Sequence, residues 1–173
     1  MEILDALRDF DGKHTKPLEE LAFRGEWDTQ AIGTLLVCVE SDESNVQSAA
    51  TWVLKCLQER GVSFNASQHN QLLNLLHKVA PWEAKLHLLQ MLPQLRVTSQ
   101  QAEPLFQTIA GFLDSEDNKF VRAWSYNGLI VLATQHRKLR KKVASLIAEG
   151  QQEEAASVKA RIRKALKDVN WME

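Results

Sequence analysis

The feature that most constrains the fold of this chain is an apolar pattern that recurs every 36 to 39 residues. The positions that we take as equivalent in its four copies are Val46, Trp82, Val121 and Val158. The residues four positions further on are Ala50, Leu86, Ser125 and Ile162, and those seven positions on are Val53, Leu89, Gly128 and Ala165. Such positions share one face of an α-helix. A period of this length is typical of arrays of helix pairs, which bury their apolar faces by stacking.

The whole chain has a helical pattern. Apolar residues recur at three- and four-residue steps, while glycine (7) and proline (4) are scarce among 173 residues. We therefore predict an all-α fold. The expected helices span residues 2–10, 17–24, 29–39, 45–60, 68–79, 82–92, 103–113, 118–136, 138–149 and 153–169.

Several helix starts can be predicted from polar side chains that accept hydrogen bonds from free helix amides. The expected N-caps are Asp28, Ser67, and Asp117 or Asn118. Thr98 and Gln101 have the spacing of a capping box, but Pro104 argues for a later start, near residue 103.

The stretch SEDNKFVRAWSYNGLIVLA, residues 115–133, illustrates how a repeat begins. Its acidic turn lies where the helix dipole favours negative charge. A basic residue follows the first apolar position, as Arg122 here and as Lys159 in the last copy. We expect these cations to pair with a carboxylate in an adjacent turn.

This stretch and ASVKARIRKAL resemble the second helix of HEAT repeats, with a Val-Arg or Val-Lys start followed by Ala/Gly-Leu. SDESNVQSAATWVL is a weaker copy, with Gln47 at the basic position. APWEAKLHLLQML is weaker still, because it lacks the acidic turn and has Glu83 at the basic position.

The resemblance to HEAT repeats implies a right-handed α-α superhelix, or solenoid, that forms a single domain over residues 1–173. It covers four helix-pair repeats behind an N-terminal helical cap, with the cap at residues 1–27 and the repeats at 28–61, 67–93, 99–136 and 138–169. The family resemblance also implies an armadillo-like scaffold for protein binding, with the second helices lining the concave side.

The charges are unevenly distributed along the chain. The net charge is only −1, but residues 1–46 hold eleven acidic and four basic residues, and residues 137–167 hold ten basic and three acidic ones. This asymmetry indicates either two solvated faces or binding surfaces of opposite charge.

Cellular location can be predicted only broadly. No run of 18 apolar residues is present, so we expect no membrane-spanning segment. The first 14 residues are acidic and unlike a signal peptide. Cys38 and Cys56 form no CxxC motif, which favours reduced, buried thiols and a cytoplasmic location.

Motifs of nucleophilic catalysis, phosphate-binding loops and metal centres are missing from the sequence. We therefore expect a protein that is not an enzyme and that needs no cofactor and no metal. The most specific enzyme alternative is a HEAT-like DNA glycosylase, a family in which an Asp follows a Trp by one helical turn. The residues four positions after Trp52, Trp82 and Trp124 are instead Cys56, Leu86 and Gly128.

If the second helices line a groove, the side chains opposite the apolar stripe face it. The groove candidates are Trp52, Lys55, His87, Met91, Tyr126, Asn127, Arg163, Lys164 and Lys167. Aromatic residues and methionine are favoured at the centres of protein interfaces. The alternative is that these side chains pack against neighbouring repeats.

The run RKLRKK, Arg137–Lys142, resembles a nucleic-acid patch, but Leu139 and Val143 keep helical apolar spacing within it. The favoured interpretation is that the run is the solvated start of a helix. A binding site for an acidic protein is the second interpretation, and a nucleic-acid site is the third.

These observations predict a non-catalytic protein-binding scaffold or adaptor. Its expected ligand is a helix or an acidic segment of another protein, held in the concave groove. The alternative is nucleic-acid binding through the basic C-terminal half. A module that acts within a larger assembly, with self-association, is a third possibility.

Overall fold

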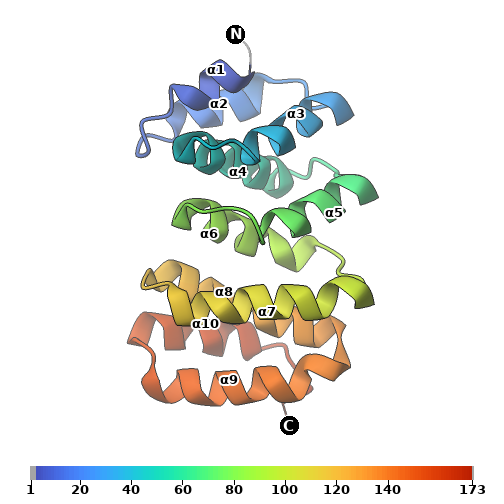
Figure 1. Ribbon diagram of the computed structural model, residues 1–173, viewed down its shortest axis with the longest axis vertical. Helices are drawn as coiled ribbons and strands as arrows, with labels where there is room; N and C mark the ends of the chain where they lie inside the picture. The colour runs from blue at the N-terminus through green and yellow to red at the C-terminus, as the bar shows by residue number, and fades with distance from the viewer. Residues whose placement is uncertain (1–2, 173) are drawn as a thin grey trace. The chain divides into compact units, whose positions relative to one another are not determined.

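The computed structural model describes residues 3–172 (Figure 1), which form ten α-helices and two short 3-10 helices without a strand. The predicted all-α class is confirmed. The α-helices are α1 (Ile3–Arg8), α2 (Lys16–Arg24), α3 (Thr29–Val39), α4 (Ser44–Glu59), α5 (Ala66–Leu75), α6 (Trp82–Met91), α7 (Ser99–Ser115), α8 (Lys119–Gln135), α9 (Arg140–Glu153) and α10 (Ala156–Leu166). The 3-10 helices are η1 (Leu92–Gln94) and η2 (Arg137–Leu139).

Local signals predicted most helix starts. Asp28 and Asn118 cap α3 and α8, as expected, and Thr98 forms the capping box of α7 with Gln101. The start predicted near residue 103 is therefore wrong: α7 begins at residue 99 and contains Pro104 at an exposed position.

The predicted cap at Ser67 is wrong. The cap of α5 is Asn65, whose side chain accepts a hydrogen bond of 2.9 Å from the backbone N–H of Gln68. The Gln68 side chain returns a bond of 2.8 Å to the Asn65 N–H, which completes a second capping box. Ser67 lies inside the first turn of the helix, where its hydroxyl has no capping role.

We expect Asn65→Ala to lower the free energy of unfolding by about 1 kcal/mol, because a free helix amide loses its acceptor. The matched change Ser67→Ala should have almost no effect. Urea denaturation of the two variants beside the parent protein measures the difference. Equal losses in the two variants would contradict the assigned cap.

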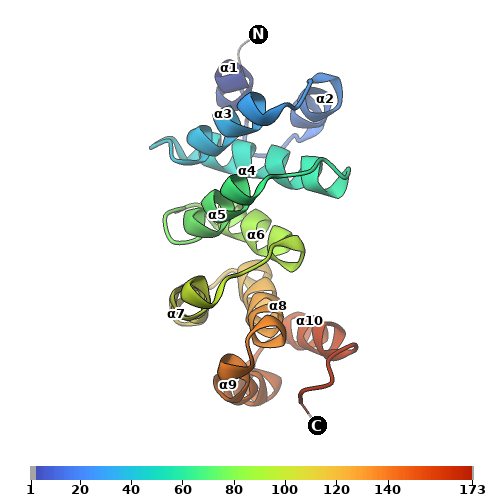
Figure 2. The same cartoon turned by 90° about the vertical axis from the view of Figure 1, so that its right-hand side faces the viewer.

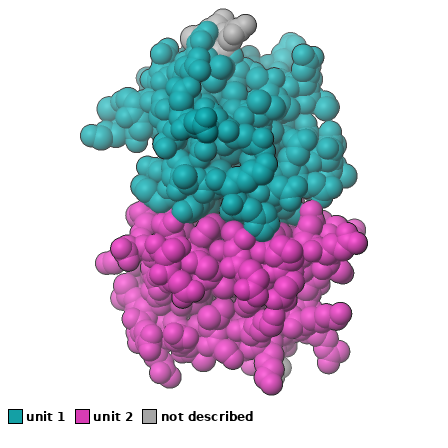
Figure 3. All heavy atoms as spheres, in the orientation of Figure 1, with its two compact units in different colours: residues 1–91 teal, residues 92–173 magenta. Residues whose placement is uncertain are grey.

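The chain divides into two compact units, residues 1–91 and 92–173 (Figure 3). In the first unit, α4 is central and packs against α1, α2, α3 and α6 (Figures 1 and 2). Helix α5 contacts both α3 and α6. The apolar stripe of α4 is fully buried; it contains Val46, Ala50, Val53 and Leu57.

In the second unit α8 is central. It packs against α7, α9, η1 and η2, and its most extensive packing is with its neighbour α10 (Figure 2). Four members of the predicted stripe are 0% exposed and belong to the core of this unit: Val121 and Ser125 of α8, and Val158 and Ile162 of α10. Ala165, at the end of the stripe, is half-buried.

The predicted register is wrong in α6. Val46, Val121 and Val158 are each the third residue of their helix, and all three are 0% exposed. Trp82 is instead the first residue of α6 and is 39% exposed, whereas the third residue, Ala84, is 0% exposed. The equivalent position is therefore Ala84, and the buried stripe continues through Leu88 and Met91.

Candidate protein-binding surface

The groove candidates of the first unit are mostly covered by their own neighbours. Met91 is 0% exposed, and the side-chain amide of Gln58 donates to its carbonyl oxygen at 3.3 Å. The corrected register of α6 explains this, because it places Met91 in the apolar stripe. The prediction that Met91 faces a partner is therefore wrong.

His87 is largely buried and lies against α4. Its Nδ1 is 3.0 Å from the hydroxyl oxygen of Thr51, a residue with 0% exposure. Burial, assisted by the charge of Lys55, lowers the pKa of His87 from 6.5 to about 4. His87 therefore acts in the structure as a neutral bridge between α4 and α6 rather than as a surface cation.

Trp52 and Lys55 are half-buried on α4. The Lys55 ammonium pairs with Glu59 one turn further along, at 2.6 Å. Both side chains are therefore partly accessible to a partner, but the Lys55 ammonium already has a carboxylate partner in Glu59.

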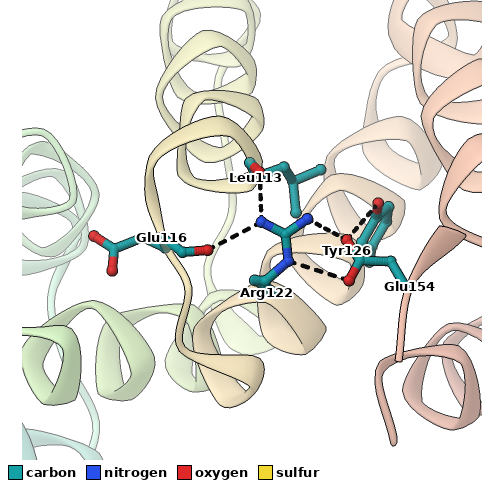
Figure 4. A network of polar contacts seen from close by, with 5 residues as sticks. All are labelled: Leu113, Glu116, Arg122, Tyr126 and Glu154. Carbon is teal, nitrogen blue, oxygen red and sulfur yellow. Dashed lines mark hydrogen bonds and ion pairs between the residues drawn. The ribbon is translucent and has the colours of Figure 1, made fainter. Parts of the chain in front are cut away.

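In the second unit, Tyr126 is only 4% exposed, so the prediction that its ring contacts a partner is wrong. Its hydroxyl donates to Oε1 of Glu154 at 3.2 Å (Figure 4). Burial, followed by the charge of Glu154, raises the pKa of Tyr126 above its ordinary value of 10. Gly150 makes room for this ring, because a Cβ there would lie 2.6 Å from the Tyr126 hydroxyl oxygen.

Arg122 is the centre of the same network (Figure 4). Its Nε donates to Glu154 Oε2 at 3.1 Å and its Nη2 pairs with Oε1 of the same carboxylate. Its Nη1 donates to the backbone oxygens of Leu113 at 2.5 Å and Glu116 at 3.0 Å. The hydrogen bond to Glu154 raises the pKa of Arg122. The predicted pairing of Arg122 with a carboxylate in an adjacent turn is confirmed, and the network joins α7, α8 and the end of α9. The same prediction for Lys159 is wrong, because its ammonium donates instead to the backbone oxygen of Gln152 at 2.9 Å.

Exposed basic residues gather at the C-terminal end of α10, where Lys167 is the C-cap. Arg163, Lys164 and Lys167 are all exposed. Within residues 3–172, no ion pair or side-chain hydrogen bond involves these three cations. We call these residues the basic α10 face.

An aromatic side chain of α8 contacts a further cation of α10. The guanidinium carbon of Arg161 lies 4.2 Å from the ring centroid of Trp124 on α8. Both residues lie three positions after their repeat's first valine, and both are half-buried. Asn127 and Lys164 follow them by about one helical turn, and the predicted candidate Asn127 is also half-buried. The pairing of Trp124 with Arg161 was not predicted from the sequence, although the repeat alignment places the two residues at the same position.

The basic run at residues 137–142 has the structure of a solvated helix start. Leu139 and Val143 are buried, while Arg137, Lys138 and Lys141 are exposed. Two further cations of the run have partners within the unit. Lys142 pairs with Glu103 at 2.6 Å, and Arg140 donates to the backbone oxygen of Ala133 at 3.2 Å.

Three further features bear on the class of protein. No helix within residues 3–172 is long and apolar enough to cross a membrane. Across the same residues, no group of three or more His, Cys, Asp or Glu side chains is arranged to hold a metal ion. Cys38 and Cys56 are free thiols, and burial raises the pKa of each.

Comparisons with protein-family models, with curated proteins and with solved structures found no match to this chain.

Proposed function

We propose that this chain is a non-catalytic protein-binding module that uses the basic α10 face to hold an acidic segment of another protein. The observation that carries the proposal is that Arg163, Lys164 and Lys167 are exposed and have no carboxylate partner among residues 3–172. Complementary charge steers association and sets specificity, so an acidic ligand suits this surface best.

The stacked pair of Trp124 and Arg161 supports a protein ligand. Tryptophan and arginine are the side chains most enriched at energetically important positions of protein interfaces. An acidic segment with occasional apolar residues can contact the half-buried indole while its carboxylates meet the cations of α10.

We further propose that the helix pairs stack as a HEAT-like solenoid, with the N-terminal helices as its cap. The packing within each unit supports this architecture. The second helices α4 and α6 pack together in the first unit, as α8 and α10 do in the second, and the first helices α3 and α5 are also in contact. A cytoplasmic location is part of the same proposal, because free thiols suit a reducing compartment.

The test compares two fluorescently labelled ligands by anisotropy: a peptide rich in glutamate and leucine, and a single-stranded oligonucleotide of similar length. We expect the peptide to bind at low salt and to be released as salt screens the exposed charges. The variant Arg163→Gln/Lys164→Gln/Lys167→Gln should bind the peptide about tenfold more weakly, because three exposed charge pairs are lost.

The matched control is Arg137→Gln/Lys138→Gln/Lys141→Gln, which removes three exposed cations from η2 and the start of α9. Peptide binding should be unchanged in this variant. Equal weakening in both variants would mean that only the net charge matters, and it would contradict the assigned surface. Tighter binding of the oligonucleotide through the same α10 cations would replace the proposal with the nucleic-acid alternative.

A further inference from the structure

The two units carry opposite net charges. Residues 1–91 contain thirteen acidic and eight basic residues, and residues 92–173 contain nine acidic and thirteen basic ones. The net charges are therefore −5 and +4. The ion pairs within each unit leave part of this charge without a partner, and the unpaired groups are the ones available to another molecule.

Unpaired carboxylates of the first unit lie around α1. Asp5 is in α1, Asp9 follows its last residue, and Asp42 is in the turn before α4. All three are exposed, and no ion pair or hydrogen bond within residues 3–172 involves their carboxylates. We call these three residues the acidic α1 surface.

Two contacts hold the parts of this surface together. Arg8 pairs with Glu43 at 2.9 Å, and the side-chain amide of Asn45 donates to the backbone oxygen of Arg8 at 3.2 Å. These contacts place the end of α1 against the turn that contains Asp42. Two cations pair with carboxylates of the segment between α3 and α4: Arg8 with Glu43, and Lys78 with Glu40 at 2.6 Å. Neither pairs with Asp42.

The acidic α1 surface and the basic α10 face each present three unpaired charges of opposite sign. We propose that the basic α10 face of one copy of this chain binds the acidic α1 surface of a second copy. Because two different surfaces meet, the contact is head to tail, and each dimer leaves one surface of each kind open to a further copy. The inference rests on the proposed function, since it names the acidic partner of the same α10 face.

The strength of this contact should depend steeply on salt. Exposed charges more than about 10 Å apart are screened at an ionic strength of 0.1 M, and exposed ion pairs contribute little singly. We therefore expect reversible association at micromolar concentrations in low salt and a monomer in high salt. Sedimentation velocity over a range of protein concentrations measures this directly.

Two neutralised variants make the test specific. The variant Arg163→Gln/Lys164→Gln/Lys167→Gln lacks only the basic face, and Asp5→Asn/Asp9→Asn/Asp42→Asn lacks only the acidic surface. All six positions are exposed, so both variants should keep the helical circular dichroism of the parent. Each alone should remain monomeric at concentrations where the parent associates.

An equimolar mixture of the two variants should form a one-to-one dimer and nothing larger, because it contains only one intact surface of each kind. The control Arg137→Gln/Lys138→Gln/Lys141→Gln should associate like the parent. A parent that stays monomeric at low salt, a mixture that stays monomeric, or association that survives in both variants would overturn the inference.

Failure of the inference can be distinguished from failure of the proposed function. The variant without the acidic surface keeps the whole basic α10 face, so its affinity for the acidic peptide tests the face alone. Peptide binding without self-association would leave the proposed function in place and remove the second copy as its partner. Absence of both would remove both proposals.

Discussion

Replacing Glu154 with alanine is expected to lower the free energy of unfolding of the second unit by about 3 kcal/mol. The Glu154 side chain is 9% exposed, and its two oxygens bind Arg122 and the Tyr126 hydroxyl. Its loss leaves a guanidinium that is 24% exposed without a counter-charge and leaves a buried hydroxyl without an acceptor. Urea denaturation followed by circular dichroism measures the effect.

Two milder variants calibrate this result. Tyr126→Phe removes one hydrogen bond and should cost about 1 kcal/mol. Lys142→Ala removes the ion pair with Glu103, in which both side chains are about half exposed, and its effect should lie close to zero. A loss for Glu154→Ala no greater than the loss for Lys142→Ala would show that the network does not stabilise the unit.

The network also shows what repeat spacing can predict. The position of Arg122 after the first valine predicted a partner in an adjacent turn, and that partner is found 32 residues further along, at Glu154. The second role of Arg122 could not be predicted, because the backbone oxygens of Leu113 and Glu116 become acceptors only through the path of the turn after α7.

Local chemistry was the reliable part of the fold prediction. Helix α3 spans the predicted residues, and the predicted caps at Asp28 and Asn118 are confirmed, because N-caps depend on neighbouring residues alone. The spacing of Thr98 and Gln101 also indicated a cap, but Pro104 led to a predicted start near residue 103, which is too late. The register of α6 was harder to predict. Its apolar residues include Leu86, Leu88 and Leu89, which fit more than one stripe, and no acidic turn marks its start.

The wrong register of α6 explains why Met91 was wrongly assigned to the candidate site. A shift of two residues turns a position on a helix by more than half a turn. Met91 was consequently assigned to a groove, although it belongs to the buried stripe. Tyr126 was misassigned for another reason, since its burial depends on a cavity that Gly150 of a different helix leaves open. Arg163, Lys164 and Lys167 were predicted from their positions opposite the apolar stripe, and they are exposed.

Acidification should destabilise the first unit through His87. The pKa of this residue is about 4 in the folded protein, and the ordinary value of 6.5 applies when the chain is unfolded. Between these values the unfolded chain binds the proton more readily, so the free energy of unfolding falls as the pH falls. The contribution of neutral His87 to the free energy of unfolding is fully present above pH 6.5. The free energy of unfolding should fall by about 3 kcal/mol through this residue once the pH has fallen to 4.

The difference between the parent and His87→Gln isolates this contribution, because the carboxylates of the two proteins titrate alike. Glutamine keeps a polar group near the Thr51 hydroxyl but cannot take up the proton, so unfolding of the variant should depend less on pH between 6.5 and 4. Lys55→Met removes the second cause of the low pKa, and NMR titration of His87 in that variant should give a higher value than in the parent. An imidazole that titrates near 6.5 in the folded parent would contradict its role as a neutral bridge between α4 and α6.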